Sequence, residues 1–82
     1  MSEKKEYHWI DDSVKIDFEI PGRTLRNTIA DAEAADLAGD YAYFGYADLI
    51  CNVDAKALVA AGKLTHKQWD VICARYREDL FG

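Results

Sequence analysis

Residues 14–22 read Val-Lys-Ile-Asp-Phe-Glu-Ile-Pro-Gly, and the periodicity of the chain changes on either side of them. Over residues 14–20 apolar and charged side chains alternate strictly, which is typical of a β-strand with one buried face. A short aromatic stretch over residues 7–9 fits another strand, and the polar residues 11–13 suit a turn between the two. We therefore predict a β-hairpin over residues 5–20, which the proline and glycine of the quoted stretch terminate.

Helical periodicity follows the hairpin and predicts three α-helices. The first spans residues 24–39, with Thr24 as its predicted N-cap, and the second spans residues 40–62. Each ends at a glycine, the residue that most easily adopts a left-handed conformation. The third helix opens at Thr65, and Gln68 three residues later completes a capping box.

Each predicted helix has one apolar face. These faces comprise Leu25, Ile29 and Ala32 in the first helix, Tyr43, Tyr46, Ile50, Val53, Ala57 and Ala60 in the second, and Trp69, Ile72, Cys73, Tyr76 and Leu80 in the third. A two-stranded hairpin is marginal in water, so its apolar face must pack on the helices. The predicted fold is α+β, with an N-terminal β-hairpin on three helices (ββααα), in a single small domain over residues 1–82 that begins with a disordered tail at residues 1–4.

Length and composition limit the classes of protein that the chain fits. Its 82 residues allow one modest core, and its 50% hydrophobic content favours a globular fold. No apolar run approaches the length of a membrane span, and the charged start is not typical of a signal peptide, so we expect a cytoplasmic protein. The two cysteines, Cys51 and Cys73, are expected to be free buried thiols.

Charge is distributed unevenly along the chain. The net charge is −5, yet no basic residue occurs between Arg26 and Lys56. The acids within this interval are Asp31, Glu33, Asp36, Asp40, Asp48 and Asp54. Uncompensated negative charge attracts cationic surfaces, so this interval indicates a partner with a basic surface. The alternative is an ordinary solvated acidic helix face.

Four aromatic residues lie inside the acidic interval. Tyr43 and Tyr46 fall on the predicted apolar face and are expected in the core, whereas Tyr41 and Phe44 point away from it. Exposed aromatics beside carboxylates could anchor a protein interface, unless the hairpin covers them. Asp36 and Asp54 fit either surface contacts or hydrogen bonds at caps and core edges. The predicted partner-binding residues are therefore Asp31, Glu33, Asp40, Tyr41, Phe44 and Asp48.

The sequence offers little for metal binding or catalysis. Its histidines and cysteines show none of the spacings of zinc sites, and no nucleophile has a base nearby in sequence. We predict no metal, no cofactor and no enzymatic activity. Direct nucleic-acid binding would rest on Lys63, Lys67, Arg75 and Arg77, but acids interrupt these bases, and this disfavours it.

Two resemblances add to these inferences. Residues 57–69, Ala-Leu-Val-Ala-Ala-Gly-Lys-Leu-Thr-His-Lys-Gln-Trp, resemble the helix–G-x-[LI]-T-x-x-[EQ]-[FW]–helix hairpin of SHOCT-type modules. This implies a tight turn between two helices and protein contacts. In size, charge and general style the chain also resembles small accessory proteins of bacterial phages and mobile elements, including anti-CRISPR-like inhibitors of host defence nucleases. No particular residues carry this second resemblance, so it assigns no site.

The favoured function is that of a non-catalytic acidic module that binds a protein. We expect a stoichiometric inhibitor that docks on a basic, nucleic-acid-binding groove of its target, where complementary charge would speed association. One alternative is a structural or regulatory module of a mobile element that self-associates through an apolar patch. Another is a small nucleic-acid-binding protein that uses the C-terminal helical hairpin.

Overall fold

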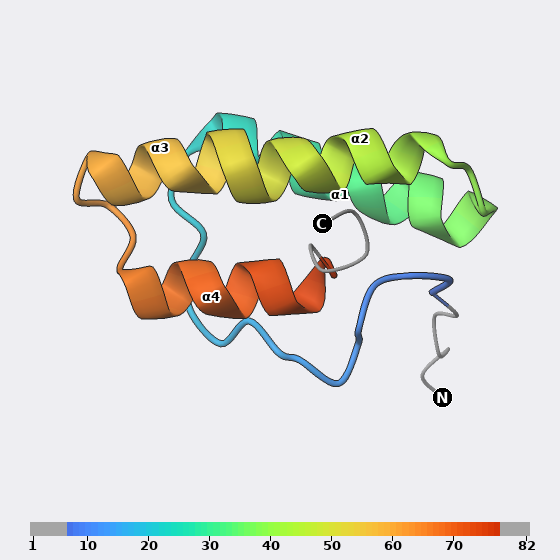
Figure 1. Ribbon diagram of the computed structural model, residues 1–82, viewed down its shortest axis with the longest axis horizontal. Helices are drawn as coiled ribbons and strands as arrows, with labels where there is room; N and C mark the ends of the chain where they lie inside the picture. Colours follow the sequence, from blue (N-terminus) through green and yellow to red (C-terminus); the bar gives the residue numbers. More distant parts are fainter. Residues whose placement is uncertain (1–6, 78–82) are drawn as a thin grey trace.

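A computed structural model describes residues 7–77 and shows a helical fold. Its elements are α1 (Arg23–Ala38), α2 (Ala42–Leu49), the π-helical turn η1 (Ile50–Asp54), α3 (Ala55–Ala60) and α4 (His66–Arg75). α2, η1 and α3 follow one another without a break and form a single rod antiparallel to α1, and α4 returns beside that rod (Figure 1). No helix among the described residues is both long enough and apolar enough to cross a membrane.

The predicted β-hairpin, and with it the α+β class, is wrong. Residues 7–77 contain no strand. Residues 7–22, the extended segment, form neither helix nor strand; they make one turn, closed by the hydrogen bond from the Val14 N–H to the Asp11 carbonyl at 3.1 Å, and pass beside α4 before entering α1 (Figure 1). The alternation over residues 14–20 is nevertheless kept: Ile16, Phe18 and Ile20 pack against the core, while the charged residues between them are exposed. An alternation of apolar and charged residues indicates that one face of a segment is buried, but not what covers it. In this protein helices, rather than a second strand, cover that face.

The backbone of the extended segment is held at its start by a buried side chain of α1. The carboxylate of Asp36 is fully buried and accepts the backbone N–H groups of His8 at 2.6 Å, Trp9 at 3.1 Å and Ile10 at 2.9 Å. These donors would otherwise need a partner strand, because buried backbone N–H groups are almost always paired. Asp36 therefore replaces the strand partner that the hairpin prediction assumed.

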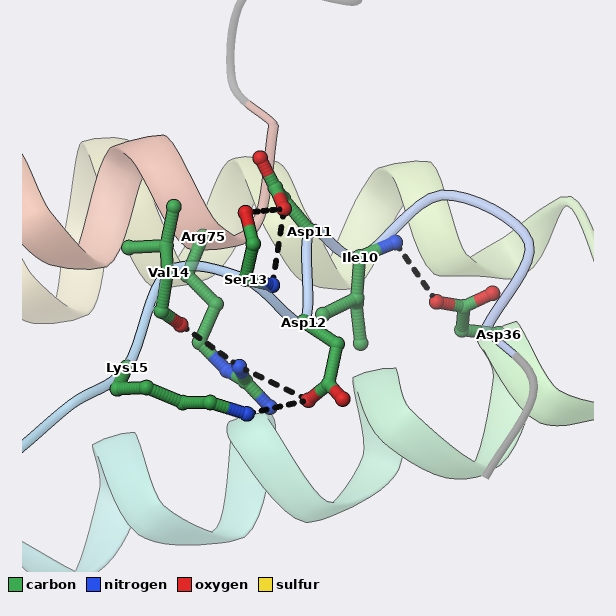
Figure 2. Close-up of polar contacts among 8 residues, drawn as sticks. All are labelled: Ile10, Asp11, Asp12, Ser13, Val14, Lys15, Asp36 and Arg75. Carbon is green, nitrogen blue, oxygen red and sulfur yellow. Dashed lines mark hydrogen bonds and ion pairs between the residues drawn. The ribbon is translucent and has the colours of Figure 1, made fainter. Parts of the chain in front are cut away.

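Arg75, at the end of α4, holds the middle of the same segment. Its backbone carbonyl accepts the N–H of Asp11 at 2.8 Å, and its Nη1 donates to the carbonyl of Val14 at 2.8 Å. The same nitrogen lies 3.5 Å from a carboxylate oxygen of Asp12, which also pairs with Lys15 at 3.6 Å (Figure 2). The segment is thus fastened to both α1 and α4.

Local capping signals are confirmed in all three predicted helices, and Gly62, the predicted end of the second one, follows α3 in the left-handed conformation, with φ 77°. Gly39 ends α1 in the left-handed conformation, with φ 69°, and the capping box of α4 is complete, with the Thr65 and Gln68 side chains each accepting the other's backbone N–H at 3.0 Å. The start of α1 differs slightly from the prediction. Its N-cap is Gly22 rather than Thr24.

The buried face of the second predicted helix is rotated from the expected one. The residues that are buried along α2, η1 and α3 are Tyr43, Ala47, Ile50, Cys51 and Ala55. Val53 is 49% exposed, and Ala57 and Ala60 are also exposed, so these three predictions are wrong.

The π-helical turn gives the physical reason. The N–H of Ala55 donates to the carbonyl of Ile50, five residues earlier, instead of to that of Cys51 as an α-helix would require. The Cys51 carbonyl accepts the indole N–H of Trp69 at 2.8 Å. In the wider turn residues four or five apart, rather than three or four apart, come to lie on one side, so Ala55 takes the place beside Ile50 that Val53 would have in an α-helix.

Tyrosines lie at the centre of the core. Tyr43 from α2 and Tyr76 after α4 are among the largest fully buried side chains, and the Tyr43 hydroxyl donates to the Tyr76 carbonyl at 2.7 Å. Ile72 of α4 is also fully buried, as predicted. The predicted contact of Leu80, the disordered tail at residues 1–4 and the start of the hairpin at residues 5–6 lie outside the described residues.

Candidate protein-binding surface

The acidic interval of the sequence remains unneutralised in the folded chain. Within residues 7–77 the ion pairs are Lys15–Asp12, Arg75–Asp12 and, when the imidazole is protonated, His8–Asp36. The predicted site acids Asp31, Glu33, Asp40 and Asp48 therefore have no cationic partner among the described residues.

Five bases lie toward one end of the helical bundle. α1 ends and α2 begins at one end, while α1 begins, α3 ends and α4 begins at the other (Figure 1). The bases in the segments toward this second end are Arg23, Arg26, Lys56, Lys63 and Lys67. Asp54 lies among them, because it lines one hollow together with Arg23 and Lys63.

Two of the predicted acids meet at one groove. A hollow of about 310 Å³ runs between α1 and α2, and both Asp31 and Asp40 line it. Its other lining residues are Ala34, Ala35, Ala38, Ala42 and Tyr46. One oxygen of Asp40 accepts the N–H of Ala42 at 2.9 Å, which orients the carboxylate at the start of α2. The groove therefore has a small, apolar floor with carboxylates beside it.

The two predicted aromatic anchors lie in an aromatic cluster. Tyr41 is 78% exposed, and its ring stacks on that of Phe44 with centroids 6.3 Å apart. Trp9 of the extended segment packs against Phe44 at 4.8 Å and reaches Tyr41 at 5.8 Å. Phe44 is consequently half-buried, while Tyr41 stays accessible on top of a rigid stack.

The remaining two predicted acids lie on different faces. Asp48 is exposed four residues after Phe44, so it shares the aromatic side of α2, and it accepts the side-chain amide of Asn52 at 2.7 Å. Glu33 lines a separate hollow of about 370 Å³ together with Lys15 and Arg75. Burial, and secondly the negative charge of Glu33, raise the pKa of Tyr7. Glu33 is therefore separated from the groove that Asp31 lines.

Two other acids of the interval make hydrogen bonds within the fold. Asp36 is fully buried beneath the extended segment, and Asp54 accepts the hydroxyl of Thr28 at 2.8 Å at the edge of the core. Both make the core-edge hydrogen bonds that were one of the two alternatives for them. Neither adds to the accessible negative surface in the way that Asp31 and Asp40 do.

No three His, Cys, Asp or Glu side chains within residues 7–77 could hold a metal ion together. Cys51 is buried and Cys73 is half-buried, and neither of the two forms a disulfide.

Two residues that belong to this surface are not among the predicted binding residues. Tyr46 was assigned to the core but is half-buried and lines the groove, and Trp9 was assigned to a strand but supports the aromatic stack. Tyr46 follows Ala42 by one helical turn, a spacing that places both on one side of α2 and that could have indicated the groove. No local signal places Trp9, because it reaches the stack through a contact between distant parts of the chain.

Comparison with known proteins does not extend these observations. No protein-family model, curated protein or solved structure significantly matches the chain.

Proposed function

We propose that this protein is a non-catalytic acidic module that binds a basic surface of another protein, and that it acts as a stoichiometric inhibitor of a nucleic-acid-binding target. The observation that carries the proposal is a set of accessible, unneutralised carboxylates on α1, on α2 and in the turn between them. Asp31, Asp40 and Asp48 are exposed and have no ion-pair partner within residues 7–77, and exposed Tyr41 lies among them in the chain.

The physics of association supports this use of the surface. A protein that binds nucleic acid presents a basic groove, and an acidic surface is attracted to the same groove by its field. Tyr41 adds a flat ring that can stack on an arginine of the target, as exposed aromatics at interfaces do. Occupation of the groove would exclude the nucleic acid, so inhibition needs no chemical step. A phage or other mobile element, whose small proteins this chain resembles in size and charge, would use such an inhibitor against a host nuclease.

The alternative that the C-terminal hairpin binds nucleic acid is weakened by the position of Arg75. Its side chain is only 11% exposed and donates to Val14 within the same molecule. One of the four bases that this alternative needs is therefore already engaged.

The test is a capture experiment with charge-reversed variants. The tagged chain is incubated with nuclease-treated bacterial lysate at about 50 and about 500 mM salt, because ion pairing at a surface weakens as screening increases. Captured proteins are identified by mass spectrometry, purified and tested for nucleic-acid binding in the presence of the chain.

Two triple variants with equal charge change separate the surface from net charge. The first carries Asp31→Lys, Asp40→Lys and Asp48→Lys, and the second carries Asp17→Lys, Glu19→Lys and Asp70→Lys, which are exposed acids elsewhere. The proposal expects a nucleic-acid-binding protein that is captured at low salt, lost with the first variant and retained with the second. Equal capture by both variants, or a mobility shift of DNA or RNA by the chain alone at low salt, would overturn it.

A further inference from the structure

The shape of the groove between α1 and α2 indicates what kind of segment of a partner protein can bind in it. Asp31 and the alanines at 34, 35 and 38 recur every three or four residues, so they share the side of α1 that borders the groove. The two helices are antiparallel (Figure 1). Ala42, the first residue of α2, therefore follows closely after the end of α1, and Tyr46, one turn later, lies nearer to the middle of α1. The groove consequently has Asp40 at one end and Asp31 at the other.

The length of the groove can be estimated from helix geometry. From Asp31 to Ala38, the last residue of α1, the helix rises by seven residues, which is about 10 Å at 1.5 Å per residue, and Asp40 follows two residues later. One cationic group is too small to contact carboxylates at both ends of a groove of this length. A segment in the extended polyproline II conformation spans about 9 Å between residues i and i+3, at roughly 3.1 Å per residue, and its three residues per turn bring those two side chains to the same side. Two basic side chains in that relation match the two ends of the groove.

The electrostatics of the groove favour a dicationic occupant. Neither carboxylate has a cationic partner within residues 7–77, and Asp40 uses only one oxygen for its hydrogen bond to Ala42. The C-terminal end of α1, which carries the negative end of the helix dipole, has no basic residue in its last turn. Arginine suits this position better than lysine, because its flat guanidinium can stack on the Tyr46 ring while it binds a carboxylate.

We infer that the groove between α1 and α2 is the docking site for an extended segment of the partner protein that carries two arginines three residues apart. Their guanidinium groups pair with Asp31 and Asp40, and the residues between them lie over the alanines and Tyr46. This inference rests on the proposed function, since it names the part of the partner that the acidic surface engages.

Two synthetic peptides of equal charge test the inference. Both are acetylated and amidated at their ends; one is Gly-Arg-Ala-Ala-Arg-Gly and the other is Gly-Arg-Arg-Ala-Ala-Gly. Each is titrated into the ¹⁵N-labelled full chain at low salt, and Kd is obtained from amide chemical shifts. The spaced peptide is expected to bind at least threefold more tightly and to shift the amide signals of Asp31, Ala38, Asp40 and Tyr46.

Single substitutions locate the two contacts. Asp31→Asn and Asp40→Asn are each expected to weaken the spaced peptide by about two- to fivefold, the range of an exposed ion pair. Asp48→Asn makes the same charge change on the other side of α2 and is expected to weaken it by less than the two groove variants do. Ala38→Leu fills the groove with both carboxylates in place and is expected to abolish the preference for the spaced peptide.

The outcomes distinguish this inference from the proposed function. Equal affinity for the two peptides, equal weakening by Asp48→Asn, or no binding of either peptide would overturn the inference about the groove. Any of these results leaves the capture experiment to decide the proposed function. Suppose that capture is lost with the variant of Asp31, Asp40 and Asp48 and that the two peptides bind equally. This result would mean that these carboxylates attract the partner, but that no segment of the partner binds specifically in the groove.

Discussion

The carboxylate of Asp36 on α1 accepts the backbone N–H of Ile10 at 2.9 Å, in a part of the molecule where both residues are buried. The same carboxylate also accepts the N–H groups of His8 and Trp9. A single side chain of a helix thus satisfies three consecutive backbone donors of the extended segment (Figure 2 shows the contact to Ile10). This arrangement explains how the segment is ordered without a partner strand.

Replacement of Asp36 by asparagine should destabilise the fold strongly. An amide offers one acceptor oxygen, and its NH₂ group would face backbone donors that need an acceptor. Leaving buried donors unsatisfied costs about 2–3 kcal/mol in the free energy of unfolding. Urea denaturation followed by circular dichroism measures the change.

Asp31→Asn provides the matched control for that variant. Asp31 lies on the same helix and is exposed, so its substitution should change the free energy of unfolding by less than about 0.5 kcal/mol. A similarly small effect for Asp36→Asn would show that the extended segment is not held by this carboxylate.

The indole of Trp69 should stabilise the π-helical turn through its bond to the Cys51 carbonyl. Trp69→Phe keeps an aromatic ring but removes the donor, and Trp9→Phe makes the same change at a half-buried indole whose N–H has no hydrogen-bond acceptor within residues 7–77. We expect Trp69→Phe to cost about 1 kcal/mol more than Trp9→Phe, the usual net value of one hydrogen bond. Equal losses by thermal and urea denaturation would contradict the role assigned to the indole.

Arg75→Lys should loosen the extended segment although the charge is kept. Lysine cannot reproduce the planar guanidinium, which reaches Val14 and lies 5.8 Å from the Tyr7 ring centroid and 5.7 Å from that of Tyr76. The expected loss is about 1 kcal/mol, with faster chymotrypsin cleavage after Phe18. Arg23→Lys, at an exposed base in the first turn of α1, should leave the cleavage rate unchanged. Unchanged cleavage in Arg75→Lys would show that other contacts hold the segment.

Stability should fall in alkaline solution because of the buried tyrosines. Burial raises the pKa of Tyr43, and burial also raises that of Tyr76. The unfolded chain therefore loses these protons first, so the stabilisation is complete below about pH 10 and is lost progressively as the pH rises above it. Urea denaturation between neutral pH and pH 11 measures this slope.

Tyr43→Phe should make that slope shallower, since one of the two groups is removed. At neutral pH it should cost about 1 kcal/mol, because the hydrogen bond to the Tyr76 carbonyl is lost. Tyr41→Phe removes a hydroxyl from a ring that is 78% exposed, and it should change the stability at neutral pH by less than about 0.5 kcal/mol. An alkaline slope of Tyr43→Phe equal to that of the unaltered chain would refute the assignment.

Most of the predictions from local capping residues are confirmed, whereas part of the prediction from helical periodicity is wrong. The capping box of Thr65 and Gln68 and the left-handed Gly39 depend on a few neighbouring residues, and both are confirmed. The apolar face of the second helix was extrapolated with a constant period, and it became wrong for Val53 because a π-helical turn intervenes. A carbonyl of that turn, Cys51, accepts the indole N–H of Trp69 from another helix, a contact that a local pattern does not reveal.

The candidate site, too, could be predicted from the sequence only in part. The absence of bases between Arg26 and Lys56 is visible in the sequence, and it predicts an acidic surface. Which acids share a surface is decided by the packing of α1 on α2, which brings Asp31 and Asp40 to one groove and leaves Glu33 at another.

Three features of this protein can be read from its residues alone: where the helices end, that residues 14–20 bury one side, and that the middle of the chain is negative. Each of these follows from neighbouring residues or from a simple count. What covers the buried side of the extended segment depends instead on how the helices pack. Backbone N–H groups bind any acceptor that lies within reach, and the packing of α1 places the carboxylate of Asp36, rather than a strand, beside residues 8–10.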